Sequence, residues 1–284
     1  MVLLSDYTVF EKGLNYSNDP TKRKIINILY NSNNKICLNK GLIEVIEKSI
    51  TEKDLFRAFI KELSDSDRFI NEKSNHNNSF YEQLSEIYNN SKVDFLIPIS
   101  LDTKKELEPI KNKLILINDE SILNKSWIVT EIISNGSCNV SFKDFKSDNE
   151  IKLFFEYIFD IPKFIRNVSI FNREQDSTYL NNLKGNNILL YTLLFSVYRD
   201  KHIHLETLKD LKKDLGGKLK IFYTSNKRLI HERKIIMGSL IISSDNSFSN
   251  LTTKEPTWEI NISYDTDKAN EWMKKCVNFK ELRK

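Results

Sequence analysis

The chain has few of the residues on which several common protein classes depend. Seven glycines in 284 residues provide neither a Walker A loop nor a dinucleotide-binding fingerprint, so ATP or NAD dependence is disfavoured. The three cysteines, Cys37, Cys138 and Cys276, are far apart and lack CxxC or Cys/His spacing. This usage argues against a zinc site or a disulfide framework. It fits a reducing cytosol, and we expect a cytoplasmic protein.

Long hydrophobic runs and a strong excess of one charge are also missing. No segment approaches the roughly 18 apolar residues of a membrane-spanning helix, and the N-terminal MVLLSDYTVF has no basic region. We therefore expect no membrane span and no signal peptide. The formal net charge is only +4, so global charge does not indicate a nucleic-acid partner. Clusters such as LKDLKKDLGGKLK and NKRLIHERK could form either a basic surface or solvated helix faces.

The residues that are present predict a folded α/β protein of two domains. The chain is 40% hydrophobic and contains 17 Phe and 11 Tyr, which is ample material for a core, and its length exceeds what one core usually organises. The predicted helix NEIKLFFEYIF ends at Asp160-Ile161-Pro162, where proline stops it. We place the domain boundary there, with domains at 1–160 and 161–284.

The N-terminal part alternates short apolar strands with helices. VLL, KICLN and LILI read as strands, and Asp19-Pro20 predicts the start of a helix that runs to Tyr30. Further helices are expected over 41–50, over 51–70, from Tyr81 and from Asp94, and two strands over 126–145. A mostly parallel sheet follows from this order.

The C-terminal part is predicted to be a second α/β domain. NVSIFN and KLKIFYTS read as strands, residues 177–200 as one or two helices, and HLETLKDLKKDLGG as a helix. The segments HERKIIMGSLIISS and TWEINISY predict antiparallel strands before a C-terminal helix, TDKANEWMKKCV.

Four carboxylates, Asp6, Glu44, Asp94 and Asp119, each lie at the edge of a short apolar run. Strand ends would place them together, and a few converging acids can hold a hard cation such as Mg²⁺. A metal of this kind lowers the pKa of water and neutralises phosphoryl charge. The alternative is that these acids lie near strand ends by chance, with Asp94 as a helix cap and Asp119 as a turn residue.

The segments VLLSDYTVF, ICLNKGLIEVI, DFLIPIS and LILINDES, in this order, resemble a PIN domain, the α/β/α metal-dependent nuclease fold. The resemblance implies that Asp6, Glu44, Asp94 and Asp119 bind Mg²⁺ or Mn²⁺ and activate a water that cleaves a phosphodiester. The sequence departs from the pattern at Pro98, where a small residue is more usual. An inactive scaffold of the same fold is the alternative.

A second candidate site is His231 followed by Arg233, Lys234, an apolar strand and a Ser/Asn-rich stretch. Imidazole can attack phosphorus while a guanidinium holds two oxygens, so these three residues are candidates for phosphate binding. A basic edge strand that resists edge pairing is the alternative.

This stretch resembles one half of a phospholipase D-like motif, and the surrounding strands resemble the phospholipase D-like fold of the MIT-associated C-terminal domain. Arg233 replaces the motif lysine, Gly238 replaces the aspartate, and no second copy is present. A site that needs two halves would then imply a homodimer.

The combined prediction is a metal-dependent nuclease, a Mg²⁺- or Mn²⁺-dependent phosphodiester hydrolase that acts on nucleic acid, with RNA favoured over DNA. By fold analogy it would suit a toxin or phage-defence effector. Two alternatives stay open. One is a non-catalytic module that binds nucleic acid or a partner protein through the C-terminal domain, and the other is a phosphodiesterase that uses His231.

Overall fold

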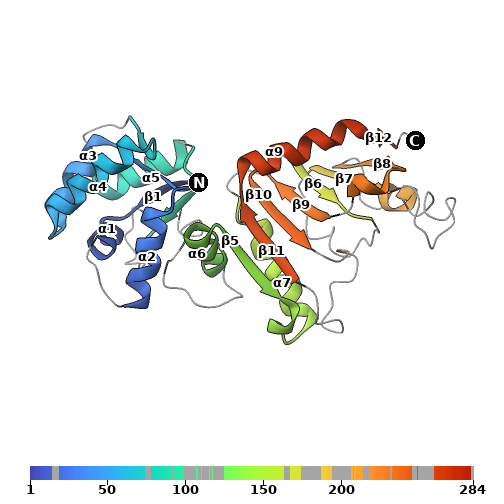
Figure 1. The fold of residues 1–284 in the computed structure, drawn as a ribbon, viewed down its shortest axis with the longest axis horizontal. Coiled ribbons are helices and arrows are strands. Elements are labelled where there is room, and N and C mark those ends of the chain that lie inside the picture. The colour runs from blue at the N-terminus through green and yellow to red at the C-terminus, as the bar shows by residue number, and fades with distance from the viewer. Residues whose placement is uncertain are drawn as a thin grey trace. The chain divides into compact units, whose positions relative to one another are not determined.

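The computed structural model divides into two compact units, Met1–Gly136 (unit 1) and Ser137–Lys284 (unit 2). It describes residues 1–14, 19–73, 78–90, 92–98, 107, 110, 115, 117, 125–162, 167–173, 187–193, 206, 208–213, 218–230, 232–244, 248 and 259–282. Each unit has its own sheet with helices around it (Figure 1). The predicted α/β class is therefore confirmed.

Unit 1 alternates strands and helices around a parallel sheet, sheet A. The strands are β1 (Val2–Ser5), β2 (Lys35–Leu38), β3 (Phe69–Asn71) and β4 (Phe95–Ile97). The helices are α1 (Tyr7–Gly13), α2 (Pro20–Tyr30), α3 (Lys40–Ser49), α4 (Lys53–Asp65), α5 (Phe80–Asn90) and α6 (Lys125–Asn135). The strand order is β3-β2-β1-β4, and all pairs are parallel.

Local sequence explains why several of these elements begin where predicted. The Asp19 carboxylate accepts a hydrogen bond from Thr21 N at 2.8 Å, and Pro20 occupies the first turn of α2. The expected helix over 51–70 is wrong at its end, because Asp67 adopts a positive φ of 54° and the chain turns into β3. The strand expected around Trp127 is also wrong: this β-branched run forms the helix α6, where tertiary packing overrides strand propensity.

Two features stabilise unit 1. The first is an aromatic core in which Phe10 contacts Phe56 edge-to-face, with ring centroids 5.3 Å apart. The second is Arg68, which is 8% exposed. Its Nε donates to Asn34 O at 2.9 Å and its Nη2 to Leu29 O. Burial lowers the pKa of Arg68, so the guanidinium is held by backbone carbonyls at a cost in desolvation.

Unit 2 is built on a larger mixed sheet, sheet B. Its strands are β5 (Ser137–Ser141), β6 (Asn167–Phe171), β7 (Asn187–Leu193), β8 (Leu219–Thr224), β9 (Arg233–Met237), β10 (Leu240–Ser244), β11 (Glu259–Tyr264) and β12 (Lys280–Glu281). The order is β12-β8-β7-β6-β9-β10-β11-β5. Strands β6, β7 and β8 are parallel, and the other pairs are antiparallel.

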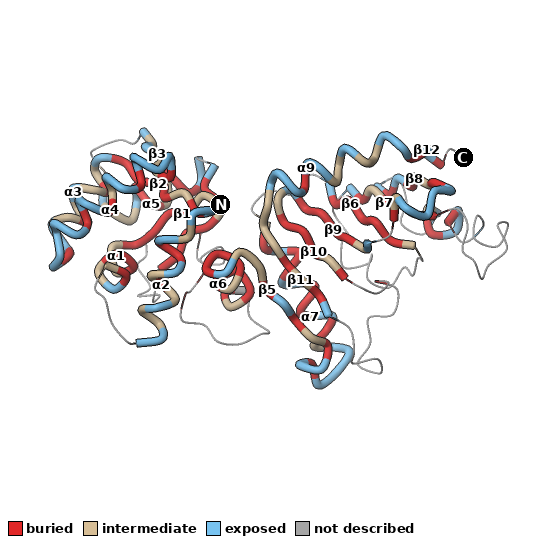
Figure 2. Tube along the Cα trace, in the orientation of Figure 1, coloured by how far each residue is buried: buried red, intermediate tan, exposed pale blue. Residues whose placement is uncertain are grey.

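Helices cover both faces of sheet B. They are α7 (Asp148–Phe159) and α9 (Thr266–Lys274), with 3-10 helices η2 (Phe142–Asp144), η5 (Lys227–Ile230) and η7 (Lys275–Asn278). In Figure 1, α9 crosses the strands in front and α7 lies behind them. The central strands are buried along most of their length (Figure 2), which agrees with a sheet covered on two sides.

Two expectations for unit 2 differ from the structure. Residues 187–193 were expected to be helical but form β7, because this apolar run lies between two paired strands at the centre of the sheet. The predicted boundary after residue 160 lies later than the observed division, because β5 pairs with β11 and so joins unit 2. Among the described residues, no helix is long and apolar enough to cross a membrane.

Candidate functional site

Asp6 lies at the carboxyl edge of sheet A, the edge at which its parallel strands end. It follows β1 and is the N-cap of α1, where its Oδ1 accepts a hydrogen bond from Thr8 N at 3.0 Å. Asn39 has the same place after β2, and its Oδ1 accepts from Leu42 N at 2.7 Å. Asp6 is 7% exposed and Asn39 is 2% exposed. Both side chains therefore satisfy backbone donors at the starts of helices.

Asp94 lies at the opposite edge of sheet A, and the expectation that it starts a helix is wrong. The segment forms β4, and Asp94 Oδ2 accepts a hydrogen bond from Val2 N at 2.8 Å. Asp94 N in turn donates to Val2 O at 2.8 Å. Asp94 is bonded to Val2 at the start of β1, and Asp6 lies four positions further along the chain, or about 13 Å along the strand. One cation cannot bridge that distance.

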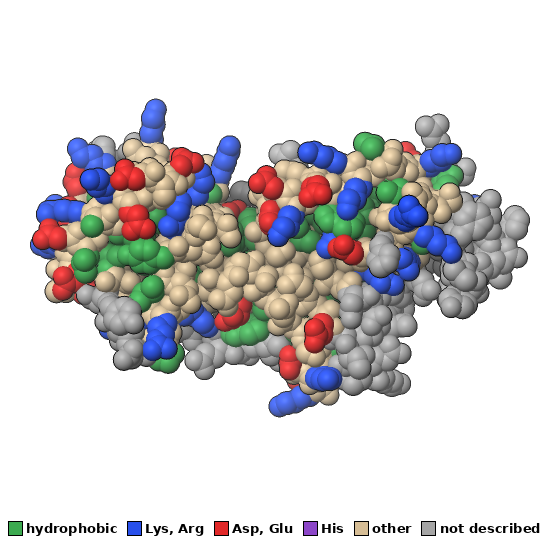
Figure 3. All heavy atoms as spheres, viewed as in Figure 1, with side chains coloured by type: hydrophobic (Ala, Val, Ile, Leu, Met, Phe, Trp, Pro, Cys, Tyr) green, Lys and Arg blue, Asp and Glu red, His purple; other side chains and the backbone are tan. Residues whose placement is uncertain are grey.

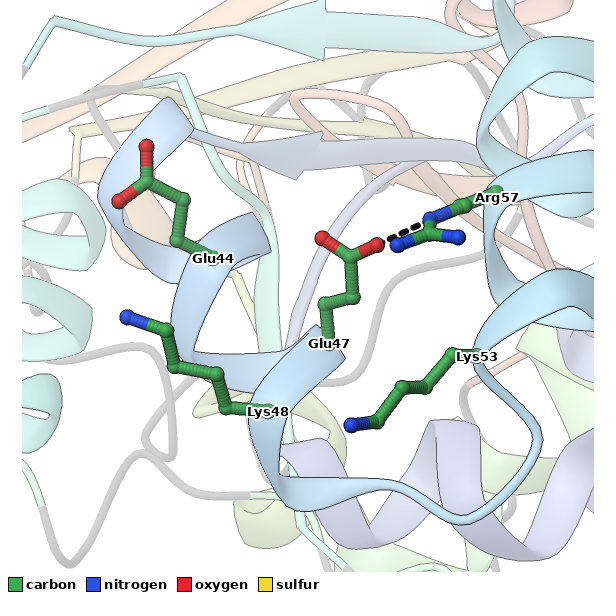
Figure 4. A pocket seen from close by; sticks show the side chains of 5 residues that line it. All are labelled: Glu44, Glu47, Lys48, Lys53 and Arg57. Carbon is green, nitrogen blue, oxygen red and sulfur yellow. Dashed lines mark hydrogen bonds and ion pairs between the residues drawn. The ribbon is translucent and has the colours of Figure 1, made fainter.

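Glu44 is exposed on α3 and lies among cations. Figure 4 shows it in a surface pocket between α3 and α4, with its carboxylate directed away from the Glu47–Arg57 ion pair. The other residues that line this pocket are Lys48 and Lys53. A carboxylate in this position is a solvated surface group.

The predicted acids therefore do not form one metal site in the described part of the chain. Asp119 lies outside the described residues. Among those that the structure describes, no group of three or more His, Cys, Asp or Glu side chains could hold a metal ion. Asp6, Glu44 and Asp94 do not fit a shared Mg²⁺ or Mn²⁺, whose ligand oxygens need to lie within about 2.0–2.6 Å of the ion. A metal at Asp6 and Asp119 stays a prediction.

Arg233 and Lys234 also do not form one cluster, contrary to the prediction that groups them with His231. They are consecutive on β9, so their side chains point to opposite faces of sheet B. Lys234 is 9% exposed. Its Nζ donates to Ser243 Oγ at 2.9 Å and pairs with Glu232 Oε2 at 2.8 Å. His231 lies outside the described residues.

A row of polar side chains crosses four neighbouring strands at the carboxyl edge of sheet B, where β6, β7 and β8 end. Thr192 is near the end of β7, Asn172 directly follows β6, and Arg233 and Ser244 are register partners on β9 and β10. The β6–β9 and β6–β7 registers place Asn172 between Arg233 and Thr192. Residues in register share a face. These four residues, the Arg233 row, therefore lie on the face opposite Lys234.

The neutral members of the Arg233 row are buried. Asn172 and Thr192 are 0% exposed and Ser244 is 7% exposed. Polar side chains are buried in folded proteins only when they are hydrogen-bonded. The Thr192 hydroxyl donates to Arg173 O at 3.3 Å. The row is therefore a fixed part of the sheet edge, in which Arg233 has a buried amide residue on one neighbouring strand and a buried hydroxyl residue on the other.

The path of the chain places the Arg233 row where the strand order reverses. The chain goes from β6 to β7 and β8 on one side of the sheet and then passes to β9 on the other side of β6. In open α/β sheets, ligands bind outside the carboxyl ends of the parallel strands. Arg173 Nε donates to Ile230 O at 2.7 Å and so joins the residues after β6 to η5, which precedes β9.

The Arg233 row has the chemistry of an anion site. A guanidinium presents paired donors that match two oxygens of a phosphate, and it keeps its charge at all working pH values. Asn172 and Ser244, on the two neighbouring strands, are neutral polar residues that can also hydrogen-bond. No carboxylate belongs to the row, so a tetrahedral anion such as a phosphate ester fits it better than a cation does.

Sequence reasoning identified Arg233 and missed Asn172, Thr192 and Ser244. Each of the three polar residues lies within or directly after an apolar strand, and that position was the available signal. Thr192 was not identified as a site residue because its segment was predicted to be a helix. The register that joins residues from four strands depends on strand order, which local patterns do not contain.

Comparisons with known proteins give only remote similarities. No family model and no curated protein matches the chain. Among solved structures, Nuc, a phospholipase D family member from Salmonella typhimurium, aligns at 9% identity and a TM-score of 0.38, over 52% of this chain and 98% of that chain. NucT from Helicobacter pylori aligns at 9% identity and 0.36, over 51% and 98%.

A third solved structure, TrmBL2, is described as an archaeal chromatin protein with a novel mode of DNA binding. It aligns at 10% identity and a TM-score of 0.33, over 82% of this chain and 72% of that chain. At these identities and TM-scores, the similarities assign neither a family nor a ligand nor a site residue to this chain.

Proposed function

We propose that the chain binds and hydrolyses phosphodiesters of nucleic acid at the carboxyl edge of sheet B. The observation that supports this proposal is the Arg233 row, in which Arg233 lies in register between two buried polar residues, Asn172 and Ser244. A cation in such a setting is suited to a phosphate ester rather than to a metal. The location, beside the reversal of strand order, is where α/β sheets bind ligands.

In the proposed reaction, His231 is the nucleophile, two residues before Arg233 in the sequence. Its neutral imidazole attacks phosphorus, the bond to the leaving oxygen breaks, and that oxygen takes a proton from solvent. Water then attacks phosphorus, the bond to the histidine nitrogen breaks, the phosphate monoester is released, and the proton lost by the water passes to solvent. Arg233 binds the non-bridging oxygens and offsets their charge in both steps. Asn172 and Ser244 fix the position of the guanidinium.

The test is hydrolysis of bis(p-nitrophenyl) phosphate and of labelled RNA and DNA in the presence of EDTA. We expect Arg233→Ala to lower kcat/KM by about 10²–10³-fold, as for the loss of a charge-stabilising donor, and His231→Ala to abolish turnover. Arg228→Ala is the matched control, because Arg228 is exposed on η5. It should stay within about twofold of the wild type.

Three results would contradict the proposal. If a folded Arg233→Ala variant turns over substrate as fast as the wild type, the active site is not at the Arg233 row of sheet B. Cleavage that requires Mn²⁺ and is abolished by Asp6→Asn would restore the metal-dependent nuclease at sheet A. Binding without turnover under any condition would favour the non-catalytic module, with a steep salt dependence as its signature.

A further inference from the structure

The face of sheet B opposite the Arg233 row is divided into two parts. Under α9 the side chains are apolar and buried: Phe171, Ile236 and Ile241 pack with Ala269 in one core cluster. Over β10, β11 and β5 they are small, polar and partly or fully exposed: Ser243, Asn261, Ser263, Asn139 and Ser137. In Figure 3 the surface over β10 and β11 is correspondingly neither hydrophobic nor charged.

A second row of polar side chains crosses this face. Lys234, Ser243, Asn261 and Asn139 are successive register partners on β9, β10, β11 and β5. Lys234 Nζ donates to Ser243 Oγ at 2.9 Å, and Asn261 Nδ2 donates to Asn139 Oδ1 at 2.7 Å. Neighbouring strands lie about 4.8 Å apart. The row, which we call the Lys234 row, is thus a regular line of hydrogen-bonding groups.

Trp272 on α9 lies at the inner end of the Lys234 row and has two cations against it. Lys275 Nζ is 3.6 Å from the ring centroid, and Lys234 Nζ is 4.9 Å from it. Lys234 is paired with Glu232, whereas Lys275 forms no ion pair with any residue that the structure describes. Because Glu232 already neutralises Lys234, Lys275 is the cation at this ring whose charge an added anion would offset.

We propose that the Lys234 row binds single-stranded nucleic acid, with a backbone phosphate at Lys275 and sugar or base edges at Ser243, Asn261 and Asn139. This inference rests on the proposed function, because it names the substrate of the Arg233 row on the other face of the same edge. Arg233 and Lys234 are adjacent on β9. A nucleic-acid strand that crosses the edge therefore meets Arg233 on one face and the Lys234 row, with Lys275 beside it, on the other.

A single strand fits this surface better than a duplex does. The Asn and Ser groups are short and lie close to a flat sheet, so they reach bases and sugars only when those are not enclosed in a helix. Amide side chains can pair with base edges through both a donor and an acceptor. Proteins that bind single strands follow the backbone with cations, and Lys275 is the cation available for that contact here.

The test measures binding of labelled oligonucleotides of about 12 nucleotides by fluorescence anisotropy, in the His231→Ala background to prevent turnover. Single-stranded RNA, single-stranded DNA and a duplex are compared. We expect Lys275→Ala to weaken binding of the single strand by about fivefold and to reduce the slope of log K against log salt by about 1. Lys274→Ala is the matched control, because it removes the same charge from the adjacent position. It should change binding by less than about twofold.

Asn261→Ala with Asn139→Ala tests the neutral part of the row and should weaken binding of the single strand without changing the salt slope. Equal losses for Lys274→Ala and Lys275→Ala would overturn the proposal, as would tighter binding of the duplex or no binding of the single strand. A failure of this binding proposal can be distinguished from a failure of the proposed hydrolysis. If Arg233→Ala hydrolyses normally while Lys275→Ala alone weakens binding, the Lys234 row stands and the proposed catalytic site fails.

Discussion

The carboxyl edges of the two sheets contain polar side chains that serve different purposes. At sheet A, Asp6 and Asn39 each follow a strand and each cap the helix that begins directly after it. At sheet B, Asn172, Arg233 and Ser244 lie side by side across paired strands instead. An acid at a strand end is therefore weak evidence for a metal site when a helix starts at the next residue. A polar row across several strands is stronger evidence for a ligand.

The largest change in stability is expected from removing a buried charged side chain of unit 1, Arg68. Arg68→Met should lower the free energy of unfolding by about 2–5 kcal/mol, because the carbonyls of Leu29 and Asn34 lose their donor. Urea unfolding measures the loss, and hydrogen exchange should locate it in α2. Lys61→Met, an exposed change on α4, is the control. If Arg68→Met leaves the free energy of unfolding unchanged, these hydrogen bonds of Arg68 do not stabilise unit 1.

Asp6 can be tested as a cap separately from its charge. Asp6→Ala should lower the free energy of unfolding by about 1–2 kcal/mol, because Thr8 N loses its acceptor. Asp6→Asn should cost less than about 0.5 kcal/mol, since asparagine caps helices equally well. Thermal unfolding of the two variants provides the measurement. Equal destabilisation by both would mean that the negative charge, and not the cap, is what this position requires.

Asp265 is the N-cap of α9 in unit 2, and its stabilising effect should depend on pH. Its Oδ1 accepts a hydrogen bond from Lys268 N at 2.9 Å, and this bond lowers the pKa of Asp265 below the usual 3.8. A lowered pKa gives stability that is present above pH 3.8 and is lost as the pH falls through the folded-state value. Between pH 6 and pH 2, the wild type should lose about 0.5–1 kcal/mol more than Asp265→Asn. Circular dichroism during acid titration of both proteins measures this difference. Equal losses of stability in the two proteins would contradict the prediction.

Much of the fold could be predicted because local patterns determine it. The Asp19-Pro20 start of α2 and the antiparallel strands β9, β10 and β11 follow from capping, proline and hydrophobic periodicity. The secondary structure of α6 and β7 was predicted wrongly. Both are apolar runs, and their neighbours in space determine whether they form a helix or a strand. Local patterns do not separate a buried strand from a buried helix of this kind.

The candidate site was harder to predict than the fold. Arg233 was identified from its neighbours in sequence, but the same reasoning grouped it with Lys234, which points to the other face of the sheet. The acids of unit 1 were chosen for their position at apolar runs. Asp94 shows why that failed: it precedes its strand, so it lies at the edge opposite Asp6. In a parallel sheet, a residue that precedes its strand lies at one edge and a residue that follows its strand lies at the opposite edge.

The most direct test of the account compares Asp6→Asn with Arg233→Gln in one assay of nucleic-acid cleavage, with EDTA or with Mn²⁺. Both substitutions remove a charge and keep a polar side chain. We predict that Arg233→Gln lowers kcat/KM by about 10²-fold or more in either condition and that Asp6→Asn leaves it within about twofold. Loss of cleavage in Asp6→Asn, together with normal cleavage by Arg233→Gln, would contradict the account and place the active site at sheet A.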